Sequence, residues 1–114
     1  MASNPERAAF DPDHAYRQMV EAGEAWADAE AAAQALEESR KSVLASLMVG
    51  QAAPSLGAKE MHALADEQYR GHVEAMVKAR KAANLARVRY DCRKVLAEMR
   101  RTQESTRRAE MNIR

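Results

Sequence analysis

The sequence predicts an all-α protein, on three observations. Aromatic residues make up 4% of the 114 residues, with four glycines and three prolines, so the residue types that sheet-rich and loop-rich folds need are scarce. Apolar residues recur at helical intervals in two long stretches. One cluster of helix breakers, residues 50–57, separates them. We therefore predict a single domain over residues 1–114, an antiparallel hairpin of two long helices with a short helix in the connection.

The first predicted helix spans about residues 12–48. Asp11 can cap its start, and Pro12 suits its first turn. Its apolar positions follow a near-heptad register, which predicts the buried seam. The seam comprises Met19, Ala22, Trp26, Ala29, Ala33, Leu36, Arg40, Val43 and Leu47. Most of these side chains are small, so the helices can approach closely while burying little area per residue.

The connection is predicted as a loop over residues 49–57 and a short helix over about 58–65. Asp66 can cap the second long helix, which is expected over about 67–110, before a frayed tail at 111–114. At about 100° per residue, one arc of this helix collects its larger apolar residues, and this arc is the predicted buried face. It holds Val73, Val77, Val88, Val95 and Met99, together with Asn84.

If Met48 faces Glu67 across the turn, the numbers of opposing residues sum to about 115. Arg40 then lies near Glu74, a carboxylate that would balance an arginine in the seam. One interface between two helices buries little for a chain of this length. We therefore expect self-association, most simply a dimer that forms a four-helix arrangement.

The net charge of +1 conceals a strong asymmetry. Residues 1–48 hold nine acids and four bases, whereas residues 70–114 hold five acids and thirteen bases. Three of these bases, Arg80, Lys81 and Arg87, flank the predicted buried face and are expected to pair with Glu30 and Glu37 of the first helix. The bases that lie roughly 100° or more from that face are predicted to point outward. They are Arg93, Lys94, Arg100, Arg101, Arg107 and Arg108.

These six outward bases are the candidate binding residues. Arginine forms two parallel hydrogen bonds with a phosphate, so its predominance over lysine favours a phosphate-binding face. No aromatic residues are interleaved for base stacking, and binding should therefore be directed at the nucleic acid backbone without sequence preference. The alternative is a solvated helix face, because long helices also carry charge for solubility.

Motifs for catalysis and metal binding are missing from the sequence. The three histidines and Cys92 form no zinc motif, and no glycine-rich phosphate loop occurs. We therefore expect no enzymatic activity, no cofactor and no metal. A single cysteine calls for no disulfide and no oxidising compartment, and no apolar run reaches the length of a membrane span. The expected location is the cytoplasm.

Two stretches, residues 79–91 (ARKAANLARVRYD) and 98–111 (EMRRTQESTRRAEM), resemble small, functionally unassigned helical proteins of bacteriophages and prophages of proteobacteria. The resemblance implies a phage setting, hence the host cell cytoplasm, with phage DNA recombination or replication as the compatible process. The leading hypothesis is a self-associating helical hairpin that contacts nucleic acid phosphates. The rival hypothesis is a protein-interaction module, such as an adaptor, an assembly chaperone or an inhibitor of a host protein, whose basic face meets an acidic protein surface.

Overall fold

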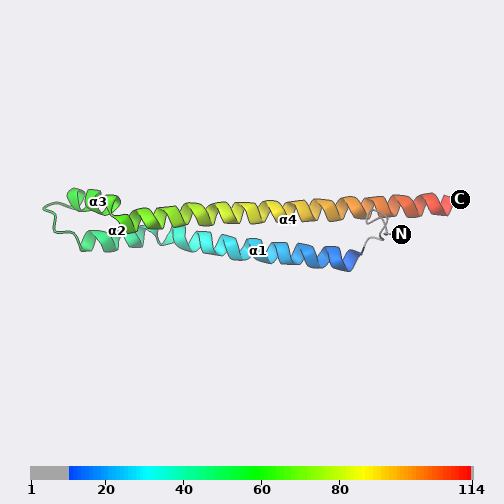
Figure 1. The fold of residues 1–114 in the computed structure, drawn as a ribbon, viewed down its shortest axis with the longest axis horizontal. Helices are drawn as coiled ribbons and strands as arrows, with labels where there is room; N and C mark the ends of the chain where they lie inside the picture. Colours follow the sequence, from blue (N-terminus) through cyan, green and yellow to red (C-terminus); the bar gives the residue numbers. More distant parts are fainter. Residues whose placement is uncertain (1–10, 114) are drawn as a thin grey trace, which may run out of the picture. The chain divides into compact units, whose positions relative to one another are not determined.

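A computed structural model describes residues 11–113, and its four helices confirm the predicted all-α class (Figure 1). They are α1 (Pro12–Glu38), α2 (Arg40–Val49), α3 (Leu56–Ala65) and α4 (Glu67–Ile113). The described residues contain no strand. The chain divides into two compact units. The terminal unit comprises residues 11–25 and 86–113 of the described chain, and the central unit comprises Trp26–Leu85.

Two predicted caps hold the starts of the long helices. The Asp11 carboxylate accepts hydrogen bonds from the backbone N–H groups of Asp13 at 3.0 Å and His14 at 3.3 Å. The Asp66 carboxylate accepts one from Gln68 at 2.7 Å. These bonds satisfy donors that have no partner inside the first turn of a helix. Both caps are therefore confirmed.

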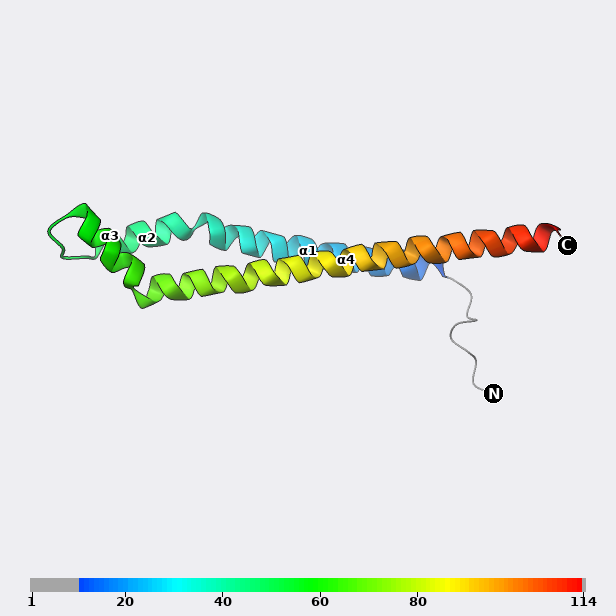
Figure 2. The same ribbon diagram turned by 90° about the horizontal axis from the view of Figure 1, so that it is seen from above.

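The connection is shorter than predicted. The hydroxyl of Ser55 accepts a hydrogen bond from the backbone N–H of Ala58 at 3.2 Å, so α3 begins at Leu56 instead of residue 58. Residues 50–55 link α2 to α3, and these two helices pack against each other in the central unit (Figure 2).

The helix predicted over 12–48 is interrupted at Ser39, which separates α1 from α2. The hydroxyl of Ser39 donates to the carbonyl oxygen of Leu36 at 3.1 Å, and Nε2 of His72 donates to the same oxygen at 2.8 Å. In a continuous helix this oxygen would accept the N–H of Arg40. Two side-chain donors therefore compete for the carbonyl at the point where the helix breaks.

At its other end α4 continues to Ile113, past the predicted end at residue 110. Residues 111–113, predicted to fray, are helical, and Arg114 lies outside the described residues. No glycine or proline follows Gly71, so nothing in this stretch stops the helix.

The buried residues are mostly alanines. Ala33, Ala63 and Ala83 are fully buried, and Ala86, Ala97 and Tyr69 are nearly so. No large side chain is fully buried among the described residues. The predicted seam of the first helix is buried or half-buried at every position except Arg40. Arg40 is exposed and donates from Nε to the hydroxyl of Tyr69 at 3.0 Å, so it is no buried charge that needs Glu74.

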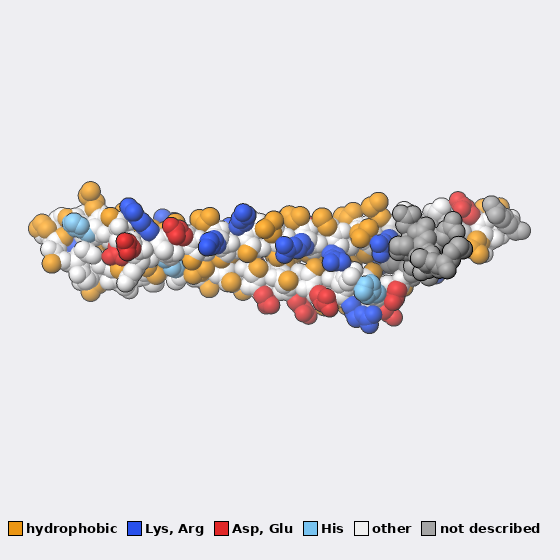
Figure 3. All heavy atoms as spheres, in the orientation of Figure 1, with side chains coloured by type: hydrophobic (Ala, Val, Ile, Leu, Met, Phe, Trp, Pro, Cys, Tyr) orange, Lys and Arg blue, Asp and Glu red, His pale blue; other side chains and the backbone are white. Residues whose placement is uncertain are grey.

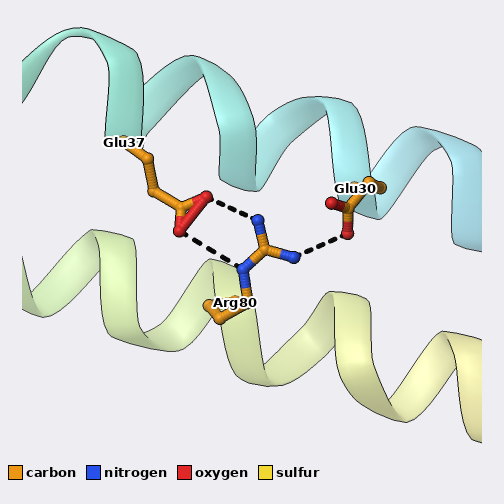
Figure 4. Close-up of polar contacts among 3 residues, drawn as sticks. All are labelled: Glu30, Glu37 and Arg80. Atoms are coloured by element: carbon orange, nitrogen blue, oxygen red, sulfur yellow. Dashed lines mark hydrogen bonds and ion pairs between the residues drawn. The ribbon is translucent and has the colours of Figure 1, made fainter.

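An ion-pair cluster joins α1 to α4 inside the central unit (Figure 4). Nη1 of Arg80 lies 2.6 Å from Glu30, and Nε and Nη2 contact both carboxylate oxygens of Glu37. These hydrogen bonds hold the pKa of Glu37 below its usual value and raise the pKa of Arg80. The predicted pairing of Arg80 is confirmed, and the same prediction for Lys81 and Arg87 stays a prediction.

Candidate anion-binding surface

In the terminal unit, α4 faces α1 through small and half-buried residues. Ala86 and Ala97 are each 7% exposed. The ring of Tyr90 lies against Gly23 of α1, where an added methyl group would meet the ring at 3.5 Å. These positions define the buried face of α4 in this unit.

The buried face predicted for the second helix is wrong. Val88, Val95 and Met99 are between 52% and 55% exposed, and in the central unit Val77 is 63% exposed. Ala83, which is fully buried, lies six residues after Val77 and therefore roughly 120° around the helix. The α1-facing side of α4 uses small residues, which let the two backbones approach closely. Val77, Val88, Val95 and Met99 face solvent, whereas Val73 of the predicted face is half-buried.

Because the observed buried face of α4 differs from the predicted one, the six candidate bases lie at other angles to α1 than predicted. All six are exposed, but they do not form one outward face. At about 100° per residue, Arg93, Arg100 and Arg107 lie along one edge of the buried face of α4. Lys94 lies toward its other edge, and Arg101 and Arg108 lie within about 20° of the direction of Tyr90. The prediction that all six point away from the partner helix is therefore wrong.

A groove runs between α1 and α4 in the terminal unit, and it brings part of the candidate set together. The groove has a volume of about 300 Å³. Its lining residues are Gln18, Glu21, Ala22 and Ala25 of α1 and Ala86, Arg89 and Arg93 of α4. A smaller hollow shares Gln18 and Arg93 with the groove and is also lined by Arg100. Arg89, Arg93 and Arg100, which we name the arginine row, therefore line two neighbouring hollows that share Gln18 and Arg93.

Arg89 was missed by the sequence reasoning. It precedes Arg93 by four residues, and Arg100 follows Arg93 by seven, so all three share one side of the helix. The spacing was visible in the sequence. Arg89 also lies about 120° from Val77, as Arg107 does, so the angle that defines the outward bases includes Arg89 as well.

Arg107 and Arg108 contact a carboxylate of their own helix. Glu104 lies 3.1 Å from Nη2 of Arg107 and 3.7 Å from Nε of Arg108, and its side chain is 23% exposed. Pairs at these spacings stabilise a helix. Both guanidinium groups are thus partly neutralised, and Arg107 and Arg108 are weaker candidates than the arginine row.

Lys94 and Arg101 are exposed and line neither the groove nor the smaller hollow. They add positive charge to the same part of α4. The candidate set predicted from sequence therefore separates into groove residues, residues paired with Glu104, and these two bases.

The part of the chain that the structure describes offers neither a metal site nor a membrane span. Residues 11–113 contain no group of three or more histidine, cysteine, aspartate or glutamate side chains placed to hold a metal ion. None of the helices in that range combines the length and the apolar character needed to cross a membrane. Comparison of the chain with protein-family models, curated proteins and solved structures finds no match.

Proposed function

We propose that the protein is a non-enzymatic helical-hairpin accessory protein that self-associates and binds nucleic acid phosphates through the arginine row. The observation that supports this proposal most directly is the placement of Arg89, Arg93 and Arg100 along two neighbouring hollows of the terminal unit. Each guanidinium group can form two parallel hydrogen bonds with a phosphate. The phage setting and the location in the host cytoplasm remain predictions from the resemblance.

The groove favours contact with a backbone over the reading of bases. Its lining contains no aromatic side chain for stacking and mixes arginine with alanine and glutamine. Glu21 also lines it and would oppose an anion locally. Contacts to phosphate position a nucleic acid without reading its sequence. The expected activity is weak binding that does not depend on sequence.

Salt dependence tests the proposal. Three phosphate contacts on a duplex release counterions, so affinity should fall roughly 40-fold between about 50 and 200 mM salt. Binding of a fluorescent duplex should lose most of this dependence when Arg89, Arg93 and Arg100 are all replaced by alanine. The control removes three exposed bases of the central unit, Arg70, Lys78 and Lys81, and leaves the total charge the same as in the test variant.

Two results would contradict the proposal. One is an equal loss of binding in the control, because the effect would then come from net charge alone. The other is absence of binding by the unmodified chain at about 50 mM salt, where phosphate contacts are strong.

A second candidate function is a protein-interaction module without a nucleic acid role. The exposed apolar side chains of the terminal unit favour it, because Val88, Val95, Leu96 and Met99 offer a surface that a protein would cover better than a phosphate backbone. In this alternative the arginine row meets an acidic protein surface. Binding to poly-glutamate that depends on the arginine row, with no binding to DNA or RNA at low salt, would select it.

A further inference from the structure

One side of α4 in the terminal unit carries a stripe of exposed apolar residues, spaced so that they share a single helix face. We name it the apolar stripe; it comprises Val88, Cys92, Val95, Leu96 and Met99. Its valine, leucine and methionine side chains are between 46% and 55% exposed, and Cys92 is exposed as well. Val88, Cys92, Val95 and Met99 lie on the side of α4 away from buried Ala86 and Ala97, and Figure 3 shows a row of hydrophobic side chains along α4. Leu96 lies at the edge of the stripe and also lines the smaller hollow beside Ala97.

Among the aliphatic residues, side-chain size is inverted between the two sides of this helix. The buried side holds Ala86 and Ala97 together with the ring of Tyr90, whereas the larger aliphatic residues are in the exposed stripe. An amphipathic helix usually buries its larger apolar side chains. An exposed stripe of this kind marks an interaction surface.

The charges beside the stripe point to a second copy of the chain. Along one edge, Arg87, Asp91, Lys94 and Glu98 alternate in sign at intervals of three and four residues. When such a row is reversed, every positive residue stands opposite a negative one. When this edge faces the same edge of an antiparallel second copy, each charged residue therefore lies opposite a residue of the other sign.

We propose that a second copy docks on the apolar stripe, with its own α4 antiparallel to the first. This proposal rests on the self-association part of the proposed function and assigns it a surface. With opposing residue numbers summing to about 185, Arg87 lies level with Glu98 of the second copy, and Asp91 lies level with Lys94 of the second copy. The two-fold axis makes each of these pairs occur twice.

The apolar residues fit the same register. Val88 comes within about two positions of the second copy's Met99, and Val95 within about two positions of the second copy's Cys92. A parallel pair would instead place Asp91 and Glu98 against the opposite edge of the stripe. The nearest residues there are Leu96 and Gln103, five positions further along, which carry no charge. Only the antiparallel arrangement therefore places apolar residues against apolar residues and also brings opposite charges level with each other.

Sedimentation of the intact chain tests whether the second copy docks on the apolar stripe. The unmodified protein should reach twice its mass of 12.7 kDa over a protein concentration series. Val95→Glu should weaken the dimer by at least about tenfold, because docking would bury an unpaired charge. Val77→Glu is the matched control, since Val77 is also an exposed valine of α4 but belongs to the central unit. Its dimer should be unchanged within about twofold.

A charge exchange tests whether the two α4 helices run antiparallel. Lys94→Glu places three acids in succession along the edge and should weaken the dimer, whereas Asp91→Lys combined with Lys94→Glu again sets opposite charges level with each other at positions 91 and 94 of the two copies and should recover it. Cys92 lies within one position of the two-fold axis in this register, so a short bismaleimide should join two unmodified chains. Loss of that cross-linked product in Val95→Glu, at unchanged helix content, would show that it depends on the stripe.

The failures are distinguishable. A chain that stays monomeric overturns the docking proposal and the self-association on which it rests, while the salt-dependent binding of a duplex can still stand. A dimer that Val95→Glu leaves intact overturns the assigned surface alone. A dimer that Lys94→Glu weakens but the double exchange does not recover overturns the antiparallel register. Loss of duplex binding with an intact dimer refutes the phosphate-binding proposal only.

Discussion

Ala83 offers the sharpest test of which side of α4 faces α1. It is fully buried in the central unit and lies three residues after Arg80, whose side chain contacts Glu30 and Glu37 of α1. Replacing it with leucine inserts three further carbon atoms between two helices that approach closely. Overpacking of this kind costs about 1–3 kcal/mol.

The neighbouring residue supplies the control. Ala82 is exposed, and its replacement by leucine makes the same chemical change on the same helix. Leucine and alanine are both good helix formers, so Ala82→Leu should change stability by no more than about 0.5 kcal/mol.

Thermal unfolding followed by far-ultraviolet circular dichroism measures the difference. At roughly 4 °C per kcal/mol for a chain of this length, Ala83→Leu should lower Tm by about 4–12 °C, and Ala82→Leu should leave it nearly unchanged. Both variants are compared at one protein concentration, because self-association also shifts Tm. If Ala82→Leu were the more damaging substitution, or if both were neutral, the buried side assigned to α4 would be refuted.

Two further predictions concern Gly71 and Glu37. Gly71 lies inside α4, and a methyl group added there meets no atom within 4 Å, so Gly71→Ala should stabilise the protein by about 0.5–1 kcal/mol; a lower Tm would contradict this. The Arg80 hydrogen bond lowers the pKa of Glu37 below 4.5, so its contribution to stability is complete above that pH and is lost as the pH falls through the lowered value. Acid titrations of unfolding should therefore be steeper for the unmodified chain than for Glu37→Gln, and identical slopes would refute this role.

The sequence predicts local features of this fold well. Asp11 and Asp66 cap helices because the capping geometry depends on residues only two or three positions away. The seam of the first helix is also predictable, since its alternative faces are charged. These features require no knowledge of the partner helix.

The buried side of α4 depends on that partner, and hydrophobic periodicity selected the wrong arc. The valines form the most apolar side of the helix, but packing against an alanine-rich seam needs small residues opposite it. The pairing of Arg80 with Glu30 and Glu37, predicted correctly, does not distinguish the two faces, because Arg80 lies about 60° from Val77 and about 60° from Ala83.

The alanine core also governs how stability responds to temperature. Exposure of apolar surface on unfolding is the main source of the heat capacity increment. A core made largely of methyl groups, with Ala33, Ala63 and Ala83 as its fully buried residues, exposes little such surface for each residue that unfolds. A single chain should therefore have a small heat capacity change and a broad, shallow stability curve. Burying the apolar stripe in a dimer would enlarge that heat capacity change and make the curve more strongly domed.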